Sequence, residues 1–220
     1  MTGAVAFDLD GVLLDSERTW ADARRAVALA HGGQWPSGVE RAMMGMSSPE
    51  WATYLHDELG VQLETAAISD DVVGRVLAIY REQLPLLPGA EGAVRRLASR
   101  WPLGVASSSN RPVIDAALAA SDLSGCFAAT VSSEEVARGK PAPDVYLAVA
   151  AALGVPPTSC AAIEDSANGV RAAASAGMVV VVVPNRDFPP DPDALSLAAR
   201  HIDSLHELTP ALIDRVGQPS

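Results

Sequence analysis

Short apolar runs that alternate with helical patterns restrict the possible folds of this chain more than any other feature. The runs occupy residues 4–8, 103–106, 128–131, 160–163 and 179–183. Beyond residue 88, segments with apolar residues at helical spacing separate them, for example Val145, Val149 and Ala152. Strands that alternate with helices form a parallel sheet covered on both faces. The sequence therefore predicts an α/β core.

The segment between the first two runs has a different pattern. From residue 16 to about residue 86 the apolar residues fall at helical spacing, as at Trp20, Ala23 and Val27, without a convincing strand. Ser48-Pro49-Glu50 is typical of a helix start, with an N-cap and then a proline at the first helical position. We predict a discontinuous core domain, residues 1–15 and 88–220, and an inserted helical cap domain, residues 16–87.

Composition excludes several classes of function. The net charge of the chain is −11, which argues against binding to nucleic acid or an anionic membrane, because the sequence has no basic stripe to hold phosphate groups. Cys126 and Cys160 match neither a disulfide framework nor a zinc motif. No targeting segment is visible, and the longest β-branched run, residues 179–183, is too short to span a bilayer. We expect a soluble, cytoplasmic monomer or weak homodimer with no nucleic-acid or membrane partner.

Acidic and hydroxyl side chains follow the predicted strands. Asp8 and Asp10 come at the end of the first run, Ser107 after the second, and Glu164 and Asp165 after the fourth. Ligands of such sheets bind beyond the carboxyl ends of the strands, so these side chains are expected at one rim. Four carboxylates would repel one another there unless a hard cation joined them. Mg²⁺, which prefers oxygen ligands, suits such a site.

The use of basic residues is also unusual. Of the 16 basic residues 15 are arginines, and the only lysine is Lys140, between Gly139 and Pro141. A compact ammonium group and a broad planar guanidinium are not equivalent where space is tight. Lys140 is therefore a candidate for a cation at the same rim.

These residue types suit phosphoryl transfer. A carboxylate can attack phosphorus, while a second carboxyl group protonates the leaving oxygen and later deprotonates water. Asp8 and Asp10 are two residues apart, so on a regular strand they would share a face, and Gly11 allows the chain to bend after them. Each signal alone is typical of an ordinary surface loop. Their joint order and their placement at strand ends favour this chemistry.

Four segments, in order along the chain, resemble the motifs of the haloacid dehalogenase-like superfamily. They are residues 7–16 (Phe-Asp-Leu-Asp-Gly-Val-Leu-Leu-Asp-Ser), Ser107 with the three residues before it, residues 139–144 (Gly-Lys-Pro-Ala-Pro-Asp) and residues 163–169 (Ile-Glu-Asp-Ser-Ala-Asn-Gly). Together they cover the predicted core. The resemblance implies a Rossmann-like parallel sheet core with an inserted α-helical cap domain that is mobile.

The resemblance also implies a role for each motif residue. Asp8 would be the nucleophile, and Asp10 the general acid and base. Ser107 would hydrogen-bond the transferring phosphoryl group, and Lys140 would stabilise Asp8 and the phosphoryl charge. The implied Mg²⁺ ligands are Asp8, Asp10 through its backbone carbonyl, Asp165, and Glu164 in a supporting position.

Within the superfamily the sequence favours a phosphatase. Metal-free dehalogenases lack the equivalent of Asp10, and the predicted cap contains no lysine for phosphonatase chemistry. A β-phosphoglucomutase-like enzyme is the alternative, since the core motifs do not separate it from a phosphatase. Its cap must grip a second phosphate, usually with charged groups. The matching positions here are uncharged: Trp20, Met44 and Ser48, around Gly45.

The implied substrate is a small phosphorylated metabolite, a sugar or polyol phosphate. Asp15-Ser16-Glu17 followed by Trp20 resembles the sugar-phosphatase branch. A non-catalytic binding protein on the same fold is a third alternative, which loss of a catalytic motif residue would have indicated. The candidate substrate contacts are Gly45, Ser108, Asn110 and Arg111.

Overall fold

One parallel sheet forms the centre of the core. The computed structural model describes residues 1–43, 46–183, 185 and 189–217. Its strands are β1 (Ala4–Phe7), β2 (Leu103–Ser107), β3 (Phe127–Ser132), β4 (Cys160–Glu164), β5 (Val179–Val182) and β6 (Arg200–His201). They are ordered β3-β2-β1-β4-β5-β6, and every pair is parallel. The predicted Rossmann-like α/β fold is confirmed.

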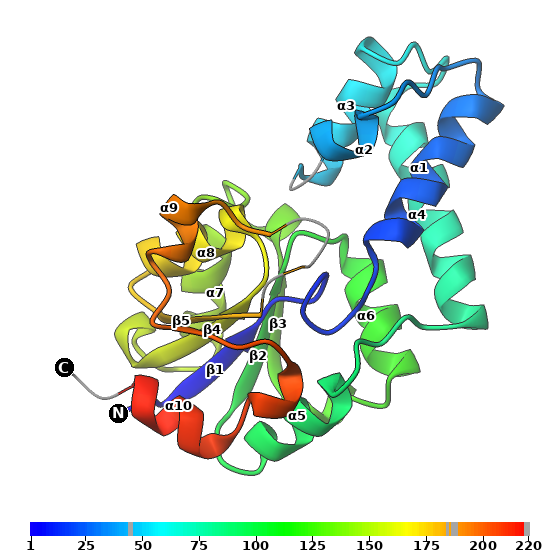
Figure 1. Ribbon diagram of the computed structural model, residues 1–220. Helices are drawn as coiled ribbons and strands as arrows, with labels where there is room; N and C mark the ends of the chain where they lie inside the picture. Colours follow the sequence, from blue (N-terminus) through cyan, green and yellow to red (C-terminus); the bar gives the residue numbers. More distant parts are fainter. Residues whose placement is uncertain (44–45, 184, 186–188, 218–220) are drawn as a thin grey trace.

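Helices cover both faces of this sheet (Figure 1). One face carries α7 (Asp144–Ala152), α8 (Ala167–Ser175) and α9 (Pro192–Leu195), and the other α5 (Ala90–Ala98), α6 (Arg111–Ala120) and α10 (Pro210–Val216). Side chains alternate along a strand, so Ala4 and Ala6 of β1 pack on the first face, and Val5 and Phe7 on the second. Burial on both faces explains why the strands are continuous apolar runs.

Four helices follow the first strand and form a separate lobe beside the strand ends (Figure 1). They are α1 (Glu17–Ala30), α2 (Val39–Ala42), α3 (Ser48–Asp57) and α4 (Thr65–Glu82), and α4 packs against α6 of the core. No strand lies among the described residues of this segment, in agreement with the expected helical insert. We call residues 16–87 the cap, with the boundaries predicted from the sequence.

Small differences from the predicted elements have local causes. The N-cap of α3 is Ser47 rather than Ser48, because Glu50 bonds back to the Ser47 backbone in a capping box. The sequence did not predict β6, since its two residues, Arg200 and His201, are exposed at the sheet edge without an apolar pattern. The remaining short elements are 3₁₀ turns at Ser124–Cys126, Ser133–Glu135, Pro157–Ser159 and Leu205–Glu207.

Helix length bears on membrane association. Among the described residues, the helices are too short or too polar for any of them to cross a bilayer.

Candidate active site

Two neighbouring strands deliver three acids to one place. Phe7 of β1 pairs in parallel register with Ile163 of β4, so Asp8, directly after β1, lies beside Glu164. Asp165 follows β4. One carboxylate oxygen from each of the three acids lies within 4.8 Å of the others. All three residues are buried, Asp8 at 6%, Glu164 at 0% and Asp165 at 3% exposure.

Two motif glycines make room for these acids. Gly11 has a φ of +78°, and a Cβ atom on it would collide with Asp165 Oδ2. A Cβ atom on Gly169, in the first turn of α8, would collide with Glu164 Oε1. The chain thus bends at Gly11 as expected, and at both positions the backbone packs directly against a carboxylate.

Lys140 is held between two of the acids. Its Nζ lies 2.9 Å from Asp8 Oδ1 and donates to Glu164 Oε1 at 2.6 Å, and its side chain is 4% exposed. The ammonium also lies 5.1 Å from the ring centre of Tyr146, whose hydroxyl donates to the same Glu164 oxygen. Burial by itself lowers the pKa of Lys140, but the two carboxylates outweigh it and raise the pKa. The lysine is a fixed cation beside Asp8.

Glu164 is fully engaged by the protein. Besides Lys140 and Tyr146 on Oε1, its Oε2 accepts hydrogen bonds from the backbone N–H groups of Asp165 and Ser166 and from the Ser166 hydroxyl. This acid orients the lysine and the start of the loop after β4. Such contacts suit the supporting position expected for it.

The carboxylate of Asp10 has hydroxyl and indole partners. Oδ1 accepts from Ser16 Oγ at 2.5 Å and from Trp20 Nε1 at 3.3 Å, and Oδ2 accepts from Ser109 Oγ at 2.6 Å. Ser107 Oγ is 3.4 Å from the same Oδ2, a long contact. The structure therefore brings Asp10 and Ser107 together as predicted, but the closer partner is Ser109, which was not among the residues predicted from the sequence.

The environment of Asp8 and Asp165 fits a bound cation. Burial raises the pKa of Asp8 to about 7, although Lys140 acts in the opposite direction. Burial, and then the charges of Glu164 and Asp8, raise the pKa of Asp165 well above its usual range. Asp165 Oδ1 is buried without a hydrogen-bond partner. A divalent cation would stabilise both ionised carboxylates and occupy the free lone pairs of Asp165, and Mg²⁺ prefers such oxygen donors.

Asn110 links the cap to the core. Its Oδ1 accepts a buried hydrogen bond from Ser48 Oγ of α3 at 2.9 Å, and its Nδ2 donates to Glu134 Oε1 at 2.7 Å. The side chain thus spans the two parts of the molecule at the N-terminus of α6. The sequence placed Asn110 near the rim but gave no sign of its cap partner.

The other candidate substrate contacts have diverse positions. Ser108 is partly exposed between Ser107 and Ser109. The guanidinium of Arg111 is bound by Glu135 at 2.6 Å and by Thr130 at 2.6 Å and 2.8 Å, so its donors are turned toward β3 and the turn after it. Gly45 lies outside the described residues.

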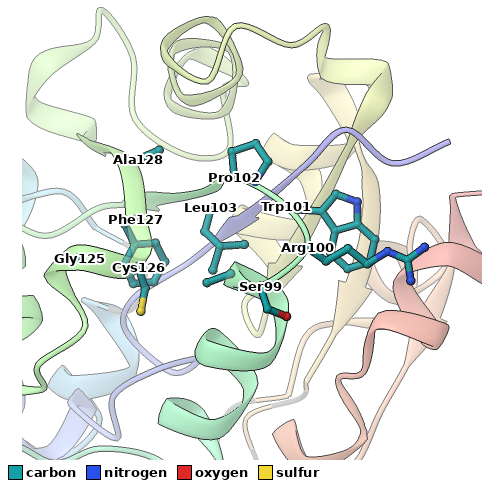
Figure 2. A pocket seen from close by; sticks show the side chains of 10 residues that line it. Ser99, Arg100, Trp101, Pro102, Leu103, Gly125, Cys126, Phe127 and Ala128 are labelled. Carbon is teal, nitrogen blue, oxygen red and sulfur yellow. The ribbon is translucent and has the colours of Figure 1, made fainter.

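A shallow recess lies at the other end of the sheet, where β2 and β3 begin. Figure 2 shows its lining, which includes Trp101, Leu103, Cys126 and Phe127. The acids, Lys140 and the serines at residues 107–109 lie at or after the opposite ends of the strands. None of the candidate site residues therefore lines this recess.

A parallel α/β fold with buried acids and a lysine at the carboxyl ends of its central strands is typical of a class of α/β hydrolases. The family model for haloacid dehalogenase-like hydrolases matches residues 2–177, and the chain belongs to that family.

Similar proteins cover nearly the same length. The chain is 37% identical to the probable pseudouridine-5′-phosphatase of Drosophila melanogaster, over 81% of this chain and 80% of that one. It is 33% identical to hexitol phosphatase B of Escherichia coli, over 94% of each. The crystal structure of CbbY from Rhodobacter sphaeroides in complex with phosphate superposes with a TM-score of 0.87 at 29% identity, covering 97% of this chain and 100% of that one.

Proposed function

We propose that this protein is a Mg²⁺-dependent phosphatase that hydrolyses a small sugar or polyol phosphate through a phosphorylated Asp8. The coarser assignment, a phosphoric monoester hydrolase of the haloacid dehalogenase-like superfamily, follows from the family match and from the phosphatases that resemble the chain over most of its length. The metal, the covalent intermediate and the substrate class are the proposed parts.

One observation carries the mechanism. Asp8 lies at the end of β1, and its Oδ1 is 2.9 Å from Lys140 Nζ. Asp8 also lies beside Asp165, whose Oδ1 is buried without a hydrogen-bond partner. A nucleophilic carboxylate needs nearby positive charge to be ionised and to stabilise the charge of the phosphoryl group. Lys140 supplies one such charge. Asp8, the backbone carbonyl of Asp10 and Asp165 would hold Mg²⁺, which supplies the other, with Glu164 in support.

The reaction has two steps. Asp8 attacks phosphorus in line, the bond to the leaving oxygen breaks, and Asp10 gives its proton to that oxygen. Water then attacks the aspartyl phosphate, Asp10 takes the proton of the water, and phosphate leaves with Asp8 regenerated. Ser107 and the N–H groups of the loop at Asp10 position the transferring group. Closure of the cap over the site excludes bulk water.

The test is phosphate release from a panel of sugar and polyol phosphates, with Mg²⁺ and with a chelator. We expect Mg²⁺-dependent release from at least one of them. The panel includes β-glucose 1-phosphate with a trace of the 1,6-bisphosphate, because the phosphomutase alternative predicts glucose 6-phosphate with little free phosphate. That product, or release that is unaffected by the chelator, would contradict the proposal.

The Asp8→Asn variant tests the nucleophile. The substitution keeps the size of the side chain and its place beside Lys140 but removes the nucleophilic charge, so turnover should be abolished while the fold is retained. Circular dichroism checks the fold, and trapping of hydroxylamine-labile phosphate on the wild-type chain after an acid quench checks the intermediate. Turnover at a rate comparable to wild type would refute the role of Asp8.

A further inference from the structure

A partly buried arginine of the cap has no role in the chemistry above. Arg24 lies on α1 four residues after Trp20, so the two side chains share one face of the helix. Its guanidinium carbon is 5.3 Å from the ring centre of Trp20 and 5.1 Å from that of Trp51 on α3. Both indoles are buried, and their ring centres are 6.3 Å apart. Two tryptophans from different helices therefore fix the position of one cation.

Arg24 lacks the partners that other cations of this protein have. Within the described residues it makes no ion pair and no hydrogen bond, and its Nε atom is buried without a partner. Lys140, by contrast, contacts two carboxylates, and Arg75 and Arg111 each contact at least one. Burial lowers the pKa of Arg24 to about 10, so the group is still charged at neutral pH.

A partly buried charge without an ion pair lowers the free energy of unfolding, because the group loses hydration. Cation–π contact with two indoles recovers part of the lost hydration, but it does not satisfy the buried Nε–H donor. The side chain also keeps partial exposure, so a ligand can reach it. An anionic group on a ligand would supply both the missing charge and the missing acceptors.

The position of Arg24 relative to Asp10 shows which part of a ligand it would meet. Trp20 donates to Asp10 through its indole nitrogen, while the guanidinium lies over the face of the same ring. The charge of Asp10 also acts on Arg24 and opposes the lowering of its pKa by burial. In the proposed reaction Asp10 protonates the leaving oxygen. The Trp20 indole separates Arg24 from Asp10, so Arg24 would contact the part of the leaving alcohol that is distant from the phosphoryl group.

We propose that Arg24, fixed by Trp20 and Trp51, is a subsite for a second anionic group on the leaving alcohol. The preferred substrates are then phosphomonoesters of acidic sugars or polyols, with a carboxylate or a second phosphate, rather than neutral ones. The inference rests on the proposed phosphatase function and narrows its substrate class. Arg24 would thus be a cap cation for the substrate, although the cap positions around Gly45 that match the mutases are uncharged.

Matched substrate pairs test this subsite. Gluconate 6-phosphate and glucitol 6-phosphate differ by one carboxylate, and fructose 1,6-bisphosphate and fructose 6-phosphate by one phosphate. We expect the wild-type enzyme to show the higher kcat/KM for the acidic member of at least one pair. Arg24→Met keeps the packing of the stem against the indoles and should lower that value about 10- to 100-fold, the loss typical of a hydrogen-bonded charge pair. Its effect on the neutral member should be under about 3-fold.

Two further variants separate charge from structure. Arg25→Met makes the same change on the exposed side of α1 and should leave both members of each pair unaffected. Arg24→Lys keeps the charge but lacks Nε, so it should retain part of the higher kcat/KM for the acidic substrate. If Arg24→Met does not fold, this variant provides the test of the subsite. A wild-type preference for neutral members, or an equal loss for both members in the Arg24 variants, would overturn the subsite.

Failure of the proposed function is a separate outcome. If the wild type hydrolyses no compound of the panel, the phosphatase proposal fails, and binding alone decides the role of Arg24. Gluconate 6-phosphate and fructose 1,6-bisphosphate are then titrated while the tryptophan fluorescence is recorded. Binding of either that Arg24→Met weakens at least about 10-fold supports the subsite. Binding of neither, or binding that Arg24→Met leaves unchanged, overturns it.

Discussion

Lys140 shows how much a single side chain can be constrained by its surroundings. Its ammonium lies 2.9 Å from Asp8 and 2.6 Å from Glu164, above the Tyr146 ring, and its side chain is almost fully buried. A guanidinium carries the same charge but needs more width and a different hydrogen-bond geometry. The chain uses arginine for every other basic position, so the choice of lysine here is governed by this space.

We therefore predict that Lys140→Arg lowers kcat about 100-fold or more, because one displaced charge at the reacting group typically costs that much. Steady-state kinetics and circular dichroism measure the rate and the fold. Arg138→Lys, an exchange in the same loop at an exposed side chain, should be close to wild type. Near-normal kinetics of Lys140→Arg would show that positive charge alone is sufficient.

At the scale of an element, α8 is packed against the carboxylate that holds the lysine. A Cβ atom on Gly169 would collide with Glu164 Oε1, so Gly169→Ala has to move either α8 or Glu164. We expect a loss of about 2–3 kcal/mol in the free energy of unfolding, typical of overpacking, together with a lower kcat because Lys140 loses its anchor. Urea unfolding and steady-state kinetics measure the two effects.

Gly74 provides the matched control. It lies within α4 with no atom near the position of a Cβ, so Gly74→Ala should stabilise the protein by up to about 1 kcal/mol through helix propensity. A stabilised and fully active Gly169→Ala variant would mean that Glu164 can shift without consequence.

The sequence predicts elements and motif residues better than the contacts between elements. Asp8 and Asp165 follow buried apolar strands, and in a parallel sheet those ends meet at one edge, so their proximity could be deduced. The bonds from Tyr146 to Glu164 and from Ser109 to Asp10, like the approach of Trp51 to Arg24, depend on how separate helices and loops pack. No local pattern encodes these contacts.

The same limit applies to the link between cap and core. From the sequence, Ser48 was interpreted as a helix N-cap and as a cap position that matches the mutase loop, whereas its hydroxyl donates to Asn110 of the core in a buried hydrogen bond. Loss of this bond leaves an unsatisfied amide oxygen when the cap is docked, at a cost of about 1 kcal/mol. The docked arrangement is then less populated, and the apparent affinity for substrate falls in proportion.

Accordingly, Ser48→Ala should raise KM about 3- to 10-fold with a smaller change in kcat. Steady-state kinetics on the best substrate of the panel measures this. Ser196→Ala removes an exposed hydroxyl far along the chain from the cap and should have no effect. An unchanged KM for Ser48→Ala would show that the hydrogen bond does not contribute to docking of the cap.

For the whole molecule, the acid cluster couples folding to pH and to the cation. Burial raises the pKa of Asp8 to about 7 and that of Asp165 well above its usual range, while both titrate near 4 in an unfolded chain. Between those values the metal-free native state binds protons that the unfolded state has released. The free energy of unfolding therefore falls as pH rises through this window. Asp71, Glu135 and Asp191, whose pKa values are lowered, titrate below it.

We predict that in chelator the Tm is lower at pH 7 than at pH 5 by at least about 3 °C, the effect of roughly 1 kcal/mol in a chain of this size. Mg²⁺ binds the ionised acids, so it should raise the Tm more at pH 7 than at pH 5. Asp8→Asn removes one of the two titrating groups and should flatten the dependence in chelator. Thermal unfolding of both chains, with and without Mg²⁺, measures these shifts. A Tm in chelator that stays level or rises from pH 5 to pH 7 would show that the acids are ionised without the metal, because the rest of the cluster already neutralises them.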